Sequence, residues 1–470
     1  MSRGTRGLRE FAATIGHATA PSTLSRWERG SSTVTHLAVR SYADALGRPE
    51  LLTVADNMAR YYGNRLGPSP ALPRPPLEPA AVSARLDSLI DRAVGKDLFT
   101  GRDWDELTDL LSRGVVVLSP RSTWETLAER LLSELAIADG THWLWRAEAL
   151  HRLLAHRVGG EVAVATAAAA AADRSAQSLI GTLSVLDATS SPLAASVVLR
   201  HLRNPTSNRS FSGALLSCHR KVRLGHFTAE QLAHVGGTLA DVDDQPLVAA
   251  IAACLPLPLR KRFSFPRRED RGRPGGRPNR IGVAAAAVND RIGTADDPVL
   301  TDLLAESLGA DVFDERMHAL FLLQASPYRA SIARELGRAL AGRHSGAELV
   351  TVAEAARNLG GQRERGVLEQ LVLAAGTSPD LRETAAFALG HVGGTSEDTF
   401  WRAVLAVARQ WRPDAGTASV LDRLVYAAGR AGHHRFLRQV VATAGLPEVA
   451  RVSARWWHGI PPHIRLSAGM

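Results

Sequence analysis

The chain has 470 residues, 45% of them hydrophobic, a net charge of +9 and an isoelectric point near 10.3. It has no apolar stretch of about eighteen residues and no apolar signal segment near Met1, so neither a membrane-spanning nor a secreted protein is expected. The two cysteines, Cys218 and Cys254, lack metal-ligand spacing and are expected to be reduced thiols in the core of a cytoplasmic protein. The basic charge favours a polyanionic partner.

The clearest short element along the chain lies between Pro21 and Gly30. Pro21 and Ser22 favour a helix start, and Gly30 favours its end. Leu24 and Trp27 lie three residues apart and can point together into a core. With Leu24 and Trp27 in the core, the solvent-facing side chains of this helix are Ser22, Ser25, Arg26 and Arg29. A short exposed helix with small hydroxyls and arginines fits the major groove of DNA.

Residues 25–30, which read Ser-Arg-Trp-Glu-Arg-Gly, resemble the end of the recognition helix in the Cro/cI-like (Xre-type) helix-turn-helix family. The resemblance covers residues 5 to about 52. Within it, residues 7–16 match the first helix of the family's motif, with core positions at Phe11, Ala12 and Ile15. The helix that supports the recognition helix is matched at Val39, Tyr42, Ala43 and Leu46.

The resemblance implies a helix-turn-helix domain over residues 1–66 that binds double-stranded DNA. It implies base contacts at Pro21, Ser22, Ser25 and Arg26, and phosphate contacts at Arg29, Thr33, Thr35 and His36. Arg26 is expected to read a guanine, because arginine pairs bidentately with its O6 and N7 atoms.

The chain departs from the family pattern in its turn, in one contact residue and in its first helix. The turn from His17 to Ala20 is two residues longer than usual, and Leu8 replaces the family's glutamine. The helix that normally precedes the motif is missing. Either the protein begins upstream of Met1, or the segment Leu51–Tyr62 completes the small core.

Two proline-containing segments separate the chain into regions. Residues 67–83 carry closely spaced prolines, which favour extended backbone, and predict a semi-rigid linker. Residues 256–280 combine prolines with many arginines and few apolar side chains, and predict a disordered basic loop. This loop is expected either to contact DNA phosphates or to be a solvated insertion without a partner. Helical repeat regions are therefore expected over residues 84–255 and 281–470.

The repeats are clearest between Ser378 and Gly393. We expect Asp380 to cap a helix, Leu381 and Ala385 to face inward, and small residues up to Gly390 to permit close packing. The unit resembles the second helix of a HEAT-type repeat, with weaker echoes over residues 352–361 and 424–432. The expected fold is all-α: a small helix-turn-helix domain and a large HEAT-like α-solenoid. A tetratricopeptide-like stack or an irregular alanine-rich helical domain stays possible, and the best strand candidate is the short run 115–118.

No motif of catalysis, phosphate binding or metal binding occurs in the chain, so no enzyme, cofactor or metal site is expected. The leading hypothesis is a dimeric, nucleoid-associated transcriptional regulator whose helical body mediates dimerisation, partner binding or ligand sensing. Its effector could be a protein, a peptide or a small molecule, and no membrane partner is expected. The alternative hypothesis is an α-solenoid interaction scaffold that the N-terminal domain tethers to DNA.

Overall fold

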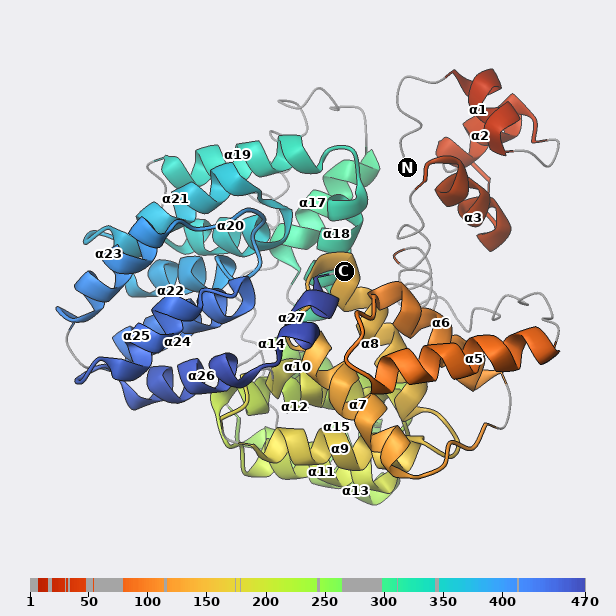
Figure 1. Ribbon diagram of the computed structural model, residues 1–470, viewed down its shortest axis with the longest axis horizontal. Coiled ribbons are helices and arrows are strands. Elements are labelled where there is room, and N and C mark those ends of the chain that lie inside the picture. The colour runs from red at the N-terminus through yellow and green to blue at the C-terminus, as the bar shows by residue number, and fades with distance from the viewer. Residues whose placement is uncertain are drawn as a thin grey trace.

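The structure is a computed structural model (Figure 1). It describes residues 7–15, 19–29, 31–32, 34–47, 54, 79–113, 116–173, 175–177, 179–242, 246–263, 298–310, 312–342, 346–411 and 414–469. Every regular element in these ranges is a helix, which confirms the prediction of an all-α fold. Residues 116–118 of the strand candidate are irregular. No helix in the described ranges is long and apolar enough to cross a membrane.

Three short helices form a small N-terminal unit: α1 (Leu8–Ile15), α2 (Pro21–Glu28) and α3 (His36–Ala45). Their shared core contains Phe11, Ala12, Ile15, Leu24 and Tyr42. The three core positions implied for the first helix are therefore buried. The rings of Phe11 and Tyr42 meet edge to face at 5.1 Å, which fixes α1 against α3.

Val54 is the one described residue of the segment expected to complete this small core. Its side chain is buried against Leu144 and Phe321 of the helical body. At this position the chain therefore packs on the body and not on the three-helix unit. The rest of the segment lies outside the described residues.

The first half of the body runs from residue 79 to residue 263. Its helices are α5 (Pro79–Val94), α6 (Gly101–Ser112), α7 (Ser122–Leu135), α8 (Gly140–Leu154), α9 (Gly160–Ala172), α10 (Leu179–Ser184), the 3-10 helix η1 (Val185–Ala188), α11 (Pro192–Arg203), α12 (Asn208–Leu224), α13 (Ala229–Ala240), α14 (Pro246–Cys254) and α15 (Leu257–Arg262). They alternate between two layers. Consecutive odd-numbered helices pack on one another, as do α6 with α8, α10 with α12, and α12 with α14.

The second half repeats this arrangement. Its helices are α17 (Pro298–Gly309), α18 (Phe313–Ala325), α19 (Arg329–Ala341), α20 (Gly346–Leu359), α21 (Gln362–Leu373), α22 (Pro379–Ala388), α23 (Asp398–Ala408), α24 (Ala415–Ala431), α25 (His434–Ala442), α26 (Glu448–Gly459) and α27 (Pro462–Ala468). The even-numbered helices α18 to α26 pack in sequence as one layer, which we name the inner layer, and the odd-numbered helices α19 to α25 form the other, the outer layer.

The boundaries of the two proline-containing segments differ from those expected. Helix α5 already begins at Pro79, inside the expected linker, because proline is tolerated in the first helical turn. Part of the expected basic loop is the helix α15, so the prediction of disorder is wrong for these residues. The aromatic ring of Phe263 packs over Gly236 of α13 and supplies the apolar anchor that the composition did not suggest. Residues 264–297 lie outside the described residues.

Two further expectations need correction. Asp380 does not cap α22: the N-cap residue is Ser378, Pro379 occupies the first helical position, and Asp380 is exposed in the first turn. Cys254 is exposed and is not a core thiol, whereas Cys218 is buried and both thiols are free. Burial raises the pKa of Cys218 well above its usual value, so this thiol stays protonated.

Close packing between successive helices of the inner layer depends on glycine. A Cβ atom on Gly390, after α22, would lie 2.8 Å from the Tyr426 ring of α24. A Cβ atom on Gly429, within α24, would lie 2.1 Å from the Trp457 ring of α26. Leu381 and Ala385 are buried, so the inward face and small-residue contact predicted for this repeat are confirmed.

The Gly429→Ala variant is expected to lose about 1–3 kcal/mol of unfolding free energy, because the methyl group overlaps the Trp457 ring. Urea unfolding followed by circular dichroism measures this change. The matched control is Gly416→Ala in the same helix, where the nearest atom, Asp414 Oδ1, is 3.5 Å from the new Cβ. Equal stability of the two variants would contradict this account of the packing.

The two halves of the body are joined by polar contacts far apart in sequence. Arg220 of α12 binds both carboxylate oxygens of Asp314 at 2.8 and 2.6 Å, and Arg209 pairs with Asp422 of α24. The C-terminal helix α27 packs on α7, as Figure 1 shows. The last helix of the stack therefore returns to its first half.

Candidate functional site

Helix α2 carries the residues to which DNA contacts were assigned by resemblance. Leu24 is completely buried, and the Trp27 ring lies 6.3 Å from the Tyr42 ring of α3. These two contacts fix which side of the short helix faces the core. Ser22, Arg26 and Arg29 are consequently exposed, and Pro21 and Ser25 are half-buried beside them. Five of the eight expected contact residues therefore share one short stretch of surface.

The arginines of this surface have no carboxylate partner among the described residues. Arg26 Nη2 lies 3.4 Å from the hydroxyl of Thr23, and Arg29 Nε donates to the carbonyl oxygen of Ser25 at 3.1 Å. Both contacts are within the helix and exposed to solvent. Their positive charges are thus available to a polyanion.

The remaining expected contacts lie at the start of α3. Thr35 is exposed and caps this helix, because its hydroxyl accepts a hydrogen bond from the backbone N–H of Ala38 at 3.2 Å. His36 is the first residue of α3, and its side chain is not among those described. Thr33 lies outside the described residues altogether. The capping role of Thr35 was missed in the sequence, although threonine before a helix is its usual signal.

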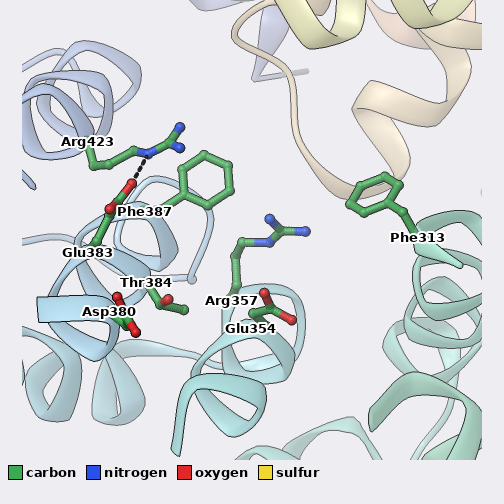
Figure 2. Close-up of a pocket in the computed structure, with 8 residues that line it drawn as sticks. All are labelled: Phe313, Glu354, Arg357, Asp380, Glu383, Thr384, Phe387 and Arg423. Atoms are coloured by element: carbon green, nitrogen blue, oxygen red, sulfur yellow. Dashed lines mark hydrogen bonds and ion pairs between the residues drawn. The ribbon is translucent and has the colours of Figure 1, made fainter. Parts of the chain in front are cut away.

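A second candidate site is a pocket of about 370 Å³ on the inner layer of the second half. Figure 2 shows eight side chains from four helices around it, namely Phe313, Glu354, Arg357, Asp380, Glu383, Thr384, Phe387 and Arg423. Helices α18, α20, α22 and α24 supply them. The helix stacking therefore places residues separated by more than a hundred positions around one cavity.

The phenyl ring of Phe387 organises the positive side of this pocket. The guanidinium carbon of Arg423 lies 4.7 Å from the ring centre and that of Arg357 lies 5.1 Å from it, both within cation–π range. Arg423 Nε is 3.4 Å from Glu383 Oε1, which also accepts a hydrogen bond from Ser419 at 2.6 Å. Burial lowers the pKa of both arginines, which marks them as poorly hydrated cations.

A partly buried network lies behind the pocket and joins it to the first half of the body. Arg430 of α24 donates to His391 Nδ1 at 2.6 Å and to Asp139 Oδ2 at 3.3 Å. Burial, reinforced by Arg430, lowers the pKa of His391 to about 4. The imidazole is therefore neutral at pH 7, and its Nε2–H is placed to donate to the Tyr426 hydroxyl at 3.2 Å. Phe387 contacts both rings of this network.

None of the eight pocket residues was singled out for binding in the sequence. Asp380 was noted only as a helix cap, and the charged positions of α20 and α24 look like solvated helix surface. The available signal was the presence of charged residues on each of the helices α20, α22 and α24. Within the described ranges, no group of three histidine, cysteine or carboxylate side chains is arranged to hold a metal ion.

Comparison of the chain with protein-family models, with curated proteins and with solved structures gives no significant match. Functional conclusions therefore depend on the residues and on their arrangement.

Proposed function

We propose that the protein is a sequence-specific DNA-binding transcriptional regulator that acts as a homodimer on the nucleoid. The observation that carries this proposal is the exposed face of α2, where two arginines without carboxylate partners among the described residues stand beside small hydroxyl side chains. The likeness of residues 25–30 to the Cro/cI-like motif supports the same interpretation.

In this proposal α1 and α2 form the helix-turn-helix, and α2 enters the major groove. Arg26 donates two hydrogen bonds to O6 and N7 of a guanine, and Ser22 and Ser25 contact neighbouring base edges. Arg29 binds a backbone phosphate. The N-terminus of α3, next to Thr35, offers the positive end of the helix dipole to a second phosphate.

One helix-turn-helix reads only a half-site, so two copies are needed for useful specificity. We assign the dimer contact and the response to an effector to the helical body, which we interpret as a HEAT-like α-solenoid. The alternation of helices between two layers in both halves of the body supports this interpretation.

The test is a genome-wide DNA pull-down with the full-length protein and its Arg26→Ala variant. The expected result is a set of discrete palindromic sites that the variant loses, with about 5- to 150-fold weaker discrimination against the wrong base. Arg9→Ala is the matched control, because Arg9 is also exposed and lies on the neighbouring helix α1. Broad DNA binding that is independent of sequence and unchanged by Arg26→Ala would contradict the proposal of a sequence-specific regulator.

That contrary result would favour the second candidate, an α-solenoid scaffold that is merely tethered to DNA. The feature that favours a scaffold is the charged surface that the inner helices form around the pocket. Discrete peaks that disappear with Arg26→Ala but persist with Arg9→Ala exclude this candidate as the main function.

A further inference from the structure

Arg357, in the inner pocket, forms no ion pair within the described part of the chain, and the carboxylates of Glu354 and Asp139 offset its charge only from a greater distance. No carboxylate among the described residues lies within ion-pair distance of it, and its Nε is buried without a hydrogen-bond partner. Its Nη2 lies 3.2 Å from the sulfur of Met317, which is a weak acceptor. A desolvated guanidinium in this position is stabilised when an anionic group approaches it.

Arg423 adds a second cation that is only partly compensated. Its contact with Glu383 is long, at 3.4 Å, and Glu383 also accepts the shorter hydrogen bond from Ser419. Figure 2 shows the guanidinium groups of Arg423 and Arg357 on two sides of the Phe387 ring. The inner end of the pocket is therefore positive and able to hold a carboxylate.

The rim of the pocket has the opposite charge. Glu354, on α20, and Asp380, in the first turn of α22, are exposed and form no ion pair within the described part of the chain. These two carboxylates without ion pairs disfavour a ligand that carries only negative charge, and they can bind an ammonium group, although Glu354 also offsets part of the charge of Arg357. The pocket thus offers separate places for an anion and for a cation.

Two phenyl rings supply the apolar surface between these places. Phe387 and Phe313 both line the cavity, and the guanidinium of Arg357 reaches into the space between them in Figure 2. A volume of about 370 Å³ lies near the small end of the range typical of small-molecule sites. The lining therefore suits a small molecule with an apolar side group.

We propose that this pocket binds a small amphoteric molecule of the amino-acid class. The carboxylate of the ligand pairs with Arg357, its ammonium group with Glu354 and Asp380, and its apolar side group packs against Phe313. A role for this ligand as the effector of DNA binding rests on the proposed function. Ligand binding itself does not, because it is measured without DNA.

The test is titration calorimetry of the full-length protein with L-phenylalanine, L-tyrosine, L-tryptophan and L-leucine. The affinity of each amino acid is compared with that of its two partners, the amine without the carboxylate and the acid without the ammonium group. For L-phenylalanine these partners are 2-phenylethylamine and 3-phenylpropanoate, which lack the carboxylate and the ammonium group respectively. At least one amino acid is expected to bind roughly 10- to 100-fold more tightly than either of its partners. Binding by none of the four, or equal binding of the acid, overturns the proposal.

Variants then locate the binding event. Arg357→Gln is expected to weaken binding by roughly 10- to 100-fold, because the amide cannot replace the charged donor. Arg402→Gln, on the outer helix α23, removes an exposed arginine and is expected to leave binding unchanged. The circular dichroism spectra of Arg357→Gln and of Asp380→Asn, the variant at the exposed rim, are compared with the spectrum of the native protein. This comparison separates a loss of binding from a loss of fold. Native binding in a folded Arg357→Gln variant, or in Asp380→Asn, overturns the proposal.

Discussion

The Glu134→Gln variant is expected to lose about 3–5 kcal/mol of unfolding free energy, because it leaves two buried arginines without their shared anion. Glu134 is completely buried in α7. Its Oε1 accepts a hydrogen bond from Arg130 Nε at 2.9 Å, and its Oε2 accepts from Arg146 Nε at 2.9 Å and from Trp104 Nε1 at 2.8 Å. A neutral amide cannot balance either guanidinium.

The two arginines of this cluster also hold the C-terminal helix. Arg146 donates to the backbone oxygen of Ser467, and the Ser467 hydroxyl accepts hydrogen bonds from the Phe99 backbone N–H at 3.1 Å and from Arg130 at 3.4 Å. Loss of the Glu134 charge is therefore expected to loosen α27 as well as α7. Faster hydrogen exchange at the amides of α27 would report this second effect.

Guanidinium chloride unfolding of the full chain measures the stability loss. The matched control is Glu129→Gln on the same helix, where the side chain is exposed and little change is expected. A Glu134→Gln variant as stable as this control would show that the buried arginines are compensated by their backbone acceptors alone.

The features of individual helices could be predicted, because they depend on the local sequence. In the segment around α22, Leu381 and Ala385 have the spacing of an inward helical face, and Gly390 marks the close contact with α24. The capping residue was assigned wrongly because Ser378-Pro379-Asp380 contains two good capping residues. The proline selects between them, since it occupies the first helical position and leaves the serine before it as the cap.

The return of the chain on itself could not be predicted, because it depends on contacts between distant segments. Nothing in the sequence around Ser467 indicates that it meets Arg130 and Arg146, more than three hundred residues earlier. The same holds for Phe263, whose anchoring contact is with a glycine of α13. Local composition describes the segment around Phe263 only as a basic loop.

The two candidate sites differ in how far local sequence defines them. The surface of α2 belongs to one short helix, so helical spacing alone separates Leu24 from Arg26 and Arg29. The inner pocket is built from four helices. Its charged residues acquire a role only when the stacking of the helices turns α20, α22 and α24 toward a common cavity. DNA binding by α2 stays a prediction until the Arg26→Ala experiment is done.

Buried His219 and half-buried His391 are expected to make the protein lose several kcal/mol of stability as the pH falls from about 6.5 to about 4. Burial is the largest cause that lowers the pKa of His391 and that of His219, each to about 4. Arg430 lowers the pKa of His391 further while Asp139 opposes this, and Arg223 and Arg220 act on His219 against Asp314. In the unfolded chain both imidazoles have ordinary pKa values near 6.5.

The sign of the effect follows from proton binding. Between pH 6.5 and pH 4 the unfolded chain binds protons on these histidines and the folded chain does not, so acidification favours unfolding. The stabilisation is complete above pH 6.5, declines as the pH falls, and is lost below about pH 4. A pKa of about 4 corresponds to about 3 kcal/mol for each histidine at neutral pH.

Unfolding free energies measured from pH 4 to pH 7 test this prediction. His391→Gln keeps an acceptor for Arg430 and a donor for Tyr426 but cannot titrate, so its stability should depend less steeply on pH than that of the native chain. His458→Gln, which replaces an exposed histidine, should leave the slope unchanged. Because Arg430 of α24 binds both His391 and Asp139, a native slope in His391→Gln would mean that this contact between the halves opens before the histidine takes up its proton.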